Sequence, residues 1–387
     1  MRIAILTTDT RESIRENLPG SAPRLPGIGF APEALLQGFA LLPDVEVHVL
    51  ACLKAPLPSP EKITPNIFYH GVVVPQTGWL RTLYQGCIRG LRKQLRKIQP
   101  DIVHGQGTER YCALSAARSG FPNVVTVHGN MRLIAAVNHA RPLTFQWLAA
   151  RLEQFTLPRT DGVVCITNYT REAVKNLARR TWVVPNAVDA EFFEVAAAPD
   201  PAAPPTGLCV GTIEPRKNQN DFIRALDQLA KERNFKMLFA SGPAQDAYGQ
   251  EFYRLVRARP WCEHIGFLNR DQLQARLAAA TFLALPTRED NCPMVVLEAM
   301  AAGVPVLASN VGGVPDLIQP EVNGLLCDPD RPETFPAAVA RLLDNRPLAA
   351  RLAAAGRAQA LNRFHPRVVA QQHVAIYREV IGKSGKP

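Results

Sequence analysis

The sequence lacks long apolar runs and closely spaced cysteines. No apolar run approaches the roughly 20 residues that an α-helix needs to span a bilayer. The opening residues, Met1–Thr7, are too few for the apolar region of a signal peptide and predict a first β-strand instead. Single, scattered cysteines argue against a zinc site or a disulfide scaffold, and they are typical of a reducing cytoplasm. The cysteines are Cys52, Cys87, Cys112, Cys165, Cys209, Cys262, Cys292 and Cys327.

Acidic residues are scarce in the first half of the chain. The 387 residues contain 44 Lys and Arg against 34 Asp and Glu, a formal net charge of +10. Residues 1–185 hold 22 basic and 12 acidic side chains, whereas residues 186–387 hold 22 of each, so the whole excess lies in the first half. Such a field attracts nucleic acid, an anionic membrane surface or a charged acceptor. A basic surface that only promotes solubility is the alternative.

Short apolar strands alternate with helical stretches, which is the pattern of a doubly wound parallel sheet. An Ala- and Pro-rich segment, Glu194–Thr206, interrupts this alternation and predicts a linker between two domains. Strands are expected first at 3–6, 45–50, 102–104, 124–128 and 162–166, and after the linker at 208–211, 237–240, 264–267, 282–285 and 306–308. The length also suits two α/β domains.

The segment Pro286–Gly313 is the most informative part of the chain. It predicts a strand, an acidic loop, a helix that begins at Pro293, and a second strand. Free N–H groups and the helix dipole make such a helix N-terminus a site for phosphate. Asp290 and Glu298 flank that N-terminus eight residues apart. The two carboxylates could also be a glycosidase acid and base, or an N-cap and an ordinary helix glutamate.

This segment closely resembles the donor site of the retaining glycosyltransferases of family 4. The signature of that family is an acid, seven residues, and a Glu in a context like LEAMAxGxPVVAS, matched here from Asp290 to Val306. The family usually has Glu at the first position, where this chain has Asp290 with Glu289 beside it. Both therefore remain candidates for contact with the donor sugar.

The resemblance extends to Gly211–Gln219, which follows a predicted strand. Lys217 matches a lysine of the family's first donor motif, whereas Thr212 stands where the family usually has Arg, so Arg216 is the candidate for that charge. Two adjacent cations in a strand-to-helix turn can neutralise a diphosphate. A surface turn with solvated charges is the alternative.

The resemblance implies a role for each residue of the donor site. Glu298 would accept from the ribose hydroxyls, and the N–H groups of Met294 and Val295 would meet the phosphate. Asn291 is a candidate helix cap or sugar contact, and Phe267 is a candidate neighbour of the base.

Three features of the first half complete this interpretation. His128 ends a predicted strand and resembles the family's histidine near the reacting sugar, and His104, which also ends a strand, is a second candidate for the acceptor pocket. Gly29, in the loop Pro26–Phe30, resembles the family's glycine loop, where backbone approaches the diphosphate. The stretch Trp79–Lys97 predicts a basic amphipathic helix. We expect it to pack on the sheet, with binding to anionic lipid as the alternative.

The resemblance implies a GT-B architecture: two facing doubly wound, Rossmann-like α/β domains with a cleft between them. We expect an acceptor domain at 1–187, a linker at 188–206, a donor domain at 207–365, and a terminal helix in 366–387 that crosses back to the first domain. The expected function is retaining, metal-independent transfer of a sugar from a nucleotide diphosphate sugar to a sugar, glycan or lipid-linked acceptor, in cell-surface polysaccharide or glycolipid biosynthesis.

No cofactor is expected, and no set of metal ligands is evident. The expected location is the cytoplasm, with peripheral attachment to the inner face of the membrane as a variant. The alternatives are a nucleotide-sugar epimerase of the same architecture and a non-catalytic nucleotide-sugar binder. A nucleic-acid partner is not expected, because the basic half has no recognition motif and no interleaved aromatic residues.

Overall fold

The structure is a computed structural model that describes residues 1–9 and 30–384. The chain forms two compact units. Unit 1 comprises Met1–Ala187 and Pro366–Pro387, and unit 2 comprises Val188–His365. The segment 188–206 therefore lies in unit 2, where Phe192 and Phe193 of the short helix η4 (Ala190–Phe193) are buried.

Unit 1 is built on an eight-stranded sheet in the order β3-β4-β2-β1-β5-β6-β7-β8. All neighbours pair in parallel except β3 and β4. From β4 onward, the order is that of doubly wound sheets, with the reversal between β1 and β5. The strands are β1 Arg2–Thr8, β2 Glu46–Leu53, β3 Lys62–Thr64, β4 Ile67–Val73, β5 Ile102–Gln106, β6 Asn123–Val127, β7 Val163–Cys165 and β8 Thr181–Val183.

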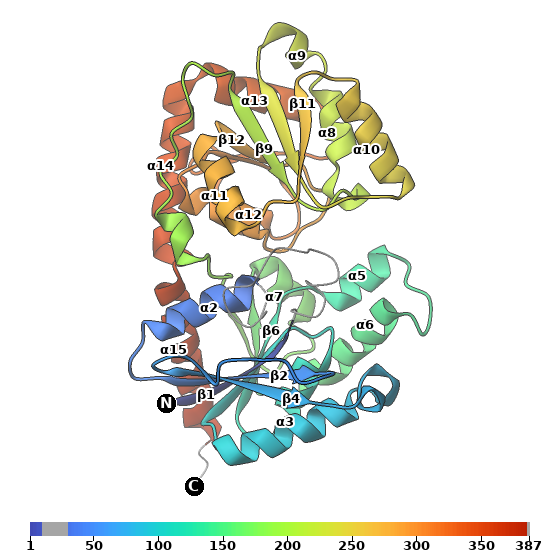
Figure 1. The fold of residues 1–387 in the computed structure, drawn as a ribbon, viewed down its shortest axis with the longest axis vertical. Helices are drawn as coiled ribbons and strands as arrows, with labels where there is room; N and C mark the ends of the chain where they lie inside the picture. The colour runs from blue at the N-terminus through green and yellow to red at the C-terminus, as the bar shows by residue number, and fades with distance from the viewer. Residues whose placement is uncertain (10–29, 385–387) are drawn as a thin grey trace. The chain divides into compact units, whose positions relative to one another are not determined.

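Helices cover both faces of the unit 1 sheet. Figure 1 shows α2 and α3 on opposite faces, and each helix contributes buried side chains to a different apolar cluster. The terminal helix α15 packs on α2, with the rings of Phe39 and Tyr377 stacked at a centroid distance of 6.2 Å. The helices are α2 Phe30–Ala40, α3 Gln85–Ile98, α4 Tyr111–Ala117, α5 Met131–Val137, α6 Phe145–Thr156, α7 Asn168–Val174 and α15 Pro366–Ser384, with short turns η1 Gln76–Gly78, η2 Leu80–Thr82 and η3 Leu157–Arg159.

Unit 2 has a six-stranded, all-parallel sheet in the order β11-β10-β9-β12-β13-β14. This is the order of a dinucleotide-binding sheet, and its direction reverses between β9 and β12. Loops that leave these two strands therefore diverge from one point at the carboxyl edge. The strands are β9 Thr206–Val210, β10 Lys236–Ala240, β11 Cys262–Gly266, β12 Phe282–Leu285, β13 Val306–Ser309 and β14 Leu325–Cys327.

The core of unit 2 is rich in phenylalanine. Phe222 and Phe335 pack edge to face at 5.4 Å, and Phe239 and Phe252 do so at 5.5 Å, a geometry that aromatic quadrupoles favour. The helices are α8 Gln219–Ala225, α9 Leu229–Glu232, α10 Ala247–Arg257, α11 Arg270–Ala279, α12 Met294–Ala301, α13 Thr334–Asp344 and α14 Arg346–Arg363, with η5 Pro215–Lys217 and η6 Val314–Asp316.

All eight cysteines lie in the described part of the chain, where they are free and buried. Desolvation raises the pKa of the Cys165 and Cys209 thiols to about 12, so these thiols stay protonated and inert at neutral pH. No described helix is both long and apolar enough to cross a membrane.

Candidate functional site

Two loops of unit 2 meet where the strand order reverses. Lys217 ends η5, which follows β9, and Asp290 lies in the loop after β12. Lys217 Nζ lies 2.5 Å from Asp290 Oδ2, and the side chains are only 15% and 13% exposed. The structure therefore brings together two residues that are 73 positions apart in the sequence. This point of a doubly wound sheet is where such folds bind ligands.

Backbone hydrogen bonds hold the two loops in register. The Arg288 N–H donates to the Arg216 carbonyl at 2.7 Å. The buried Thr287 hydroxyl lies 3.0 Å from that carbonyl and 2.9 Å from the Glu289 carbonyl. The cationic turn and the acidic loop therefore form one piece of structure, and sequence reasoning did not single out Thr287.

Arg216 faces Glu289 while Lys217 faces Asp290. The Arg216 guanidinium donates to the Glu289 carbonyl at 3.0 Å and to Glu214 Oε1 at 2.7 Å, and it lies 3.6 Å from Glu289 Oε2. Burial raises the pKa of the Glu289 carboxyl, and the Arg216 charge opposes that shift. The two acids therefore differ in environment: Asp290 is paired and largely enclosed, and Glu289 is paired nearer to solvent.

Gly312 closes the site beneath Asp290. The Gly313 N–H donates to the Asp290 carbonyl at 2.9 Å. Gly312 has a φ of +55°, and a Cβ atom on it would lie 2.0 Å from the same carbonyl oxygen. Only glycine satisfies both the left-handed backbone and this close approach.

Helix α12 begins next to this pair. Its N-cap is Pro293, which makes no side-chain cap, so Asn291 is not the helix cap. Asn291 instead donates its N–H to Asp290 Oδ1 at 3.0 Å. Within the described residues, the N–H groups of Met294 and Val295 have no hydrogen-bond partner. The first turn of α12 therefore offers free N–H groups that can donate hydrogen bonds to an anion.

Glu298 lies one turn further along α12 in a charged group that the sequence did not reveal. Burial and the neighbouring Asp189 raise the pKa of Glu298 to about 7, whereas the positive charge of Arg270 opposes the shift. Arg270 pairs with the buried Asp189. Asp189 also caps η4, because its carboxylate accepts from the Glu191 N–H at 3.0 Å. No motif signals Arg270, which acts as counter-charge for two acids distant in sequence.

Phe267 follows β11, three residues before Arg270, and is 42% exposed. Gly29, the candidate for the glycine loop, lies outside the described residues.

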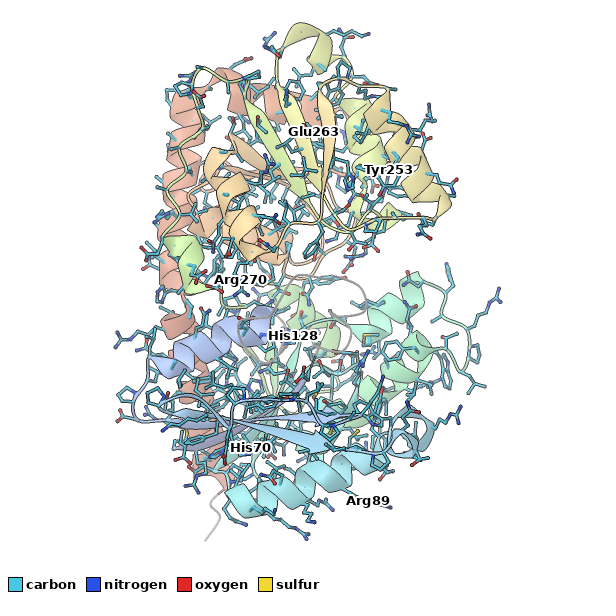
Figure 2. All side chains as sticks on the ribbon, viewed as in Figure 1. His70, Arg89, His128, Tyr253, Glu263 and Arg270 are labelled. Carbon is cyan, nitrogen blue, oxygen red and sulfur yellow. The ribbon has the colours of Figure 1, made fainter. Side chains whose placement is uncertain are left out.

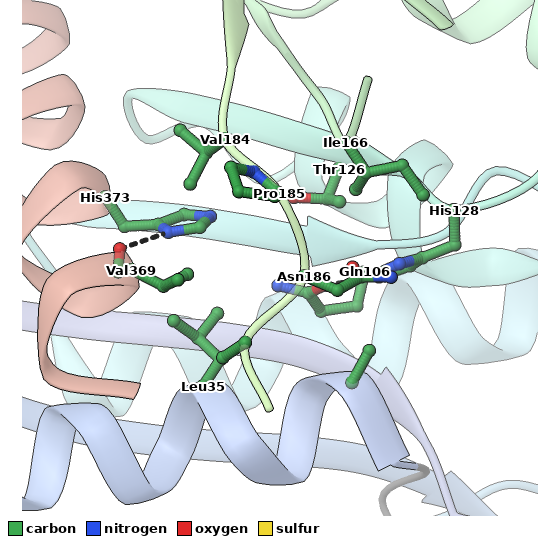
Figure 3. A pocket seen from close by; sticks show the side chains of 12 residues that line it. Leu35, Gln106, Thr126, His128, Ile166, Val184, Pro185, Asn186, Val369 and His373 are labelled. Carbon is green, nitrogen blue, oxygen red and sulfur yellow. Dashed lines mark hydrogen bonds between the residues drawn. The ribbon is translucent and has the colours of Figure 1, made fainter. Parts of the chain in front are cut away.

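In unit 1, His128 (labelled in Figure 2) follows β6, and its ring lies next to Gln106 (Figure 3). These two residues begin a chain of polar contacts that runs into the core. His128 Nε2 lies 2.7 Å from Gln106 Oε1, and Gln106 Nε2 lies 3.2 Å from His104 Nε2. His104 Nδ1 in turn lies 2.5 Å from the Tyr377 hydroxyl of α15. Because an amide oxygen only accepts, His128 Nε2 carries a proton and donates to Gln106. Gln106, which sequence reasoning missed, thus sets the tautomer of His128.

Burial keeps His128 and His104 uncharged at neutral pH. Desolvation lowers the pKa of His128 to about 4, although a hydrogen bond to Asn186 opposes the shift. His104 is completely buried, and its pKa lies well below the ordinary value for the same reason. The expectation that His104 faces an acceptor pocket is therefore wrong, because its ring is enclosed between the sheet and α15.

Comparisons with known proteins agree with this geometry. The family model described as "Glycosyl transferases group 1" matches residues 193–359, and the model described as "Glycosyltransferase Family 4" matches residues 35–192. The 2-deoxystreptamine glucosyltransferase of Streptomyces kanamyceticus is 28% identical over 386 residues, which cover 92% of this chain and 96% of that protein. A GDP-mannose-dependent alpha-(1-6)-phosphatidylinositol monomannoside mannosyltransferase of Mycobacterium tuberculosis is 31% identical over 223 residues, 51% of this chain and 56% of that protein.

Solved structures show the same architecture. Sucrose-phosphate synthase from Thermosynechococcus elongatus aligns with a TM-score of 0.77 at 20% identity and covers 99% of this chain and all of that one. The Anabaena protein HepE in complex with UDP aligns with a TM-score of 0.72 at 17% identity, over 98% of this chain and all of that one. The expected GT-B fold of two Rossmann-like domains is confirmed. Among the described residues, no group of three or more His, Cys, Asp and Glu side chains is placed to hold a metal ion.

Proposed function

Because this chain belongs to the glycosyltransferases of family 4, we propose that it moves a sugar from a nucleotide diphosphate sugar to an acceptor. The reaction retains the configuration of the anomeric carbon and needs no metal ion. The observation that carries the proposal is the enclosed Lys217–Asp290 pair, which lies beside the start of α12 at the switch point of the unit 2 sheet.

The leaving diphosphate binds between the cationic turn and α12. Lys217 and Arg216 neutralise its charge, and the N–H groups of Met294 and Val295 donate to a phosphate oxygen. These cations and N–H groups are held in place before the nucleotide sugar binds, because the two loops are hydrogen-bonded to each other. Preorganised donors that face a developing charge make a large contribution to catalysis.

Asp290 is the better supported of the two candidate acids for the donor sugar. Its carbonyl and one carboxylate oxygen are fixed by the Gly313 and Asn291 N–H groups, and its other carboxylate oxygen meets Lys217. Glu289 instead forms an ion pair with Arg216. Asp290 thus orients the sugar next to the cation that neutralises the leaving group.

Glu298 accepts from the ribose hydroxyls, and Phe267 borders the base. Arg270 keeps a fraction of Glu298 ionised at neutral pH, since Glu298 titrates near 7. An ionised carboxylate is a stronger acceptor for two hydroxyls than its protonated form.

His128 contacts the reacting sugar in a neutral form. Gln106 and Asn186 engage its ring, so the contact is made with a fixed orientation and no net charge. A neutral imidazole adds positioning without repelling an oxocarbenium-like transition state.

The acceptor is a sugar, glycan or lipid-linked glycan of cell-surface polysaccharide or glycolipid biosynthesis. The names of the two relatives give 2-deoxystreptamine and phosphatidylinositol monomannoside as acceptors, so the acceptor screen should contain water-soluble and lipid-linked compounds. The donor screen should contain UDP-, GDP- and ADP-sugars.

The test is nucleotide release from that donor panel in the presence of a chelator. We expect one donor to be turned over by the wild type, and turnover to be lost in Glu298→Ala but kept in Glu263→Ala, an exposed carboxylate of the same unit. Conversion of the donor sugar to its epimer without an acceptor would reassign the enzyme. Binding without turnover of any donor and acceptor pair would show a non-catalytic binder.

A further inference from the structure

The outer face of α3 is the most one-sided charged surface among the described residues of unit 1. The stretch from Lys62 to Pro100 contains basic residues and no Asp or Glu. Five of these cations lie on α3 itself and are exposed. The basic residues of the stretch are Lys62, Arg81, Arg89, Arg92, Lys93, Arg96 and Lys97.

The fold separates the two faces of α3. Its apolar side chains are buried against the sheet and α4, so they cannot enter another apolar phase. Arg89, Lys93 and Lys97 recur every fourth residue and therefore lie along one exposed row. Figure 2 shows Arg89 directed away from the body of unit 1. The apolar residues of α3 that are buried are Cys87, Ile88, Leu91, Leu95 and Ile98.

The cations of α3 have no carboxylate partner. Within the part of the chain that the structure describes, none of the five takes part in an ion pair. Arg92 instead donates to the Arg118 carbonyl at 3.0 Å through Nε, which places the Arg118 backbone beside the row. Arg118 in turn lies over the exposed ring of Phe155, at 5.6 Å from its centroid. The positive surface therefore continues beyond the helix.

An apolar side chain stands at the start of this surface. Leu83 is 48% exposed and has a φ of +48°, and the next residue, Tyr84, has a φ of +60° and is buried. Two consecutive left-handed non-glycine residues are disfavoured. The turn sends Tyr84 into the core and leaves Leu83 in solvent, two residues before α3 begins.

We propose that the face formed by Leu83, Arg89, Arg92, Lys93, Arg96 and Lys97 binds the surface of an anionic lipid bilayer. The cations attract anionic headgroups, and Leu83 enters the boundary between headgroups and acyl chains. This inference rests on the proposed function, because such binding holds a glycosyltransferase beside a lipid-linked acceptor. A bilayer fits better than nucleic acid, since α3 carries no aromatic side chain for stacking on bases, and the exposed ring of Phe155 next to the cations already packs against Arg118 and Arg159.

The test is flotation of the full chain with vesicles of phosphatidylcholine alone and of phosphatidylcholine with phosphatidylglycerol. We expect binding only to the anionic vesicles, weakened by salt. The triple variant Arg89→Gln, Lys93→Gln and Lys97→Gln should lower the partition coefficient about 100-fold, since each surface cation contributes roughly one factor of five. Arg92 is left unchanged because it holds the Arg118 carbonyl.

The matched control removes three exposed cations of unit 2, Lys231, Lys236 and Arg346, which also lack ion pairs among the described residues. This control should bind vesicles as the wild type does. Leu83→Asn, which tolerates the left-handed backbone, should weaken binding severalfold without changing the salt dependence.

Three outcomes would overturn the proposal: no binding to anionic vesicles, an equal loss in both triple variants, or tighter salt-dependent binding to nucleic acid than to vesicles. Donor turnover with a water-soluble acceptor separates this test from that of the proposed function. The α3 variant should keep that turnover, so a failure of lipid binding leaves the transferase assignment intact, and a failure of transfer leaves the flotation result readable.

Discussion

The cations around the unit 2 site and the cations of α3 in unit 1 are used in opposite ways. In unit 2, Lys217 pairs with Asp290, Arg270 with Asp189, and Arg259 with Asp227 through two bonds of 2.6 Å. In the described part of unit 1, the cations of α3 face solvent without any carboxylate. Paired charges fix the geometry of a site, whereas unpaired charges remain available to a partner. Net charge alone does not distinguish these uses.

Removal of the cation at the unit 2 site should have the largest effect. Lys217→Ala leaves Asp290 without its partner and removes a cation that we propose neutralises the leaving diphosphate. We expect turnover to fall about 10²- to 10³-fold, the range for loss of one preorganised electrostatic group. Initial rates at saturating donor are the measurement, and Lys217→Arg should recover part of the loss. Full turnover by Lys217→Ala would remove the diphosphate role.

Gly312→Ala tests whether unit 2 depends on the close packing under Asp290. The added Cβ meets the Asp290 carbonyl and the backbone is left-handed, so we expect a loss of about 3 kcal/mol in the free energy of unfolding. Gly120→Ala in unit 1 is the control, because Gly120 has a φ of +89° and open space around it. The control should lose about 1 kcal/mol from backbone strain alone. Equal losses in chemical denaturation would contradict the packing argument.

Glu298 should make donor binding depend on pH near neutrality. The carboxyl pKa is raised to about 7, so ionisation, which we propose strengthens the contact with the ribose, is gained as the pH rises from 6 to 8. We expect donor KM to fall about three- to tenfold over that range, and Glu298→Gln to show no such change.

Folding stability should respond to pH in the opposite direction to donor binding. A raised acid pKa means that the fold favours the protonated form, so this contribution is full below about pH 4.5 and is lost as the pH rises through about 7. Glu298→Gln should therefore be more stable than the wild type at pH 8 by about 1 kcal/mol. Thermal unfolding of both proteins at pH 5 and pH 8 checks the prediction, which a constant difference would contradict.

In unit 1, Gln106 should act as a positioning residue for His128. Gln106→Leu removes the acceptor for His128 Nε2, and we expect kcat to fall about tenfold with little change in donor KM. Gln106→Glu keeps an acceptor but adds a negative charge, which raises the pKa of His128 from its value of about 4. NMR titration of His128 in both variants separates this role from a merely structural one, which would leave the His128 pKa unchanged.

The smallest expected effect comes from removing one paired cation of unit 2 and one unpaired cation of α3 and comparing the stability of the two variants. Arg259→Gln breaks the two bonds to Asp227 and should cost about 1 kcal/mol of unfolding free energy. Lys93→Gln removes the same charge from the α3 face and should change that free energy by less than about 0.5 kcal/mol. Chemical denaturation of both variants is the measurement. A cost for Lys93→Gln equal to that of Arg259→Gln would show that the α3 cations have a structural role.

Sequence patterns predicted the sheets better than they predicted the contacts at the site. Strands with short apolar runs, such as Phe282–Leu285, coincide with β12 because a strand buried on both faces needs no alternation. The edge strand β3 and its neighbour β4, at 62–73, were missed because polar and glycine residues interrupt their apolar pattern. The basic helix was expected within Trp79–Lys97, but α3 begins at Gln85 because Leu83 and Tyr84 are left-handed.

The motif at Asp290 and Glu298 predicted the acidic loop and its helix, since both lie in one continuous segment. Arg270 and Gln106 could not be found in this way. Their roles depend on side chains that the fold brings from other elements, Asp189 for the one and His128 for the other. A single sequence carries no local signal for such pairs.

Helix α15 has a consequence for the order in which the protein is made. Its residues Tyr377 and His373 complete the core around His104, and it packs along α2 near the beginning of the chain. Synthesis from the N-terminus therefore finishes every residue of unit 2 before unit 1 has its last helix. Unit 1 begins first but matures last, so the nascent chain carries an incompletely covered face of the unit 1 sheet throughout the synthesis of unit 2. A chain that stops before Pro366 would keep part of that face exposed.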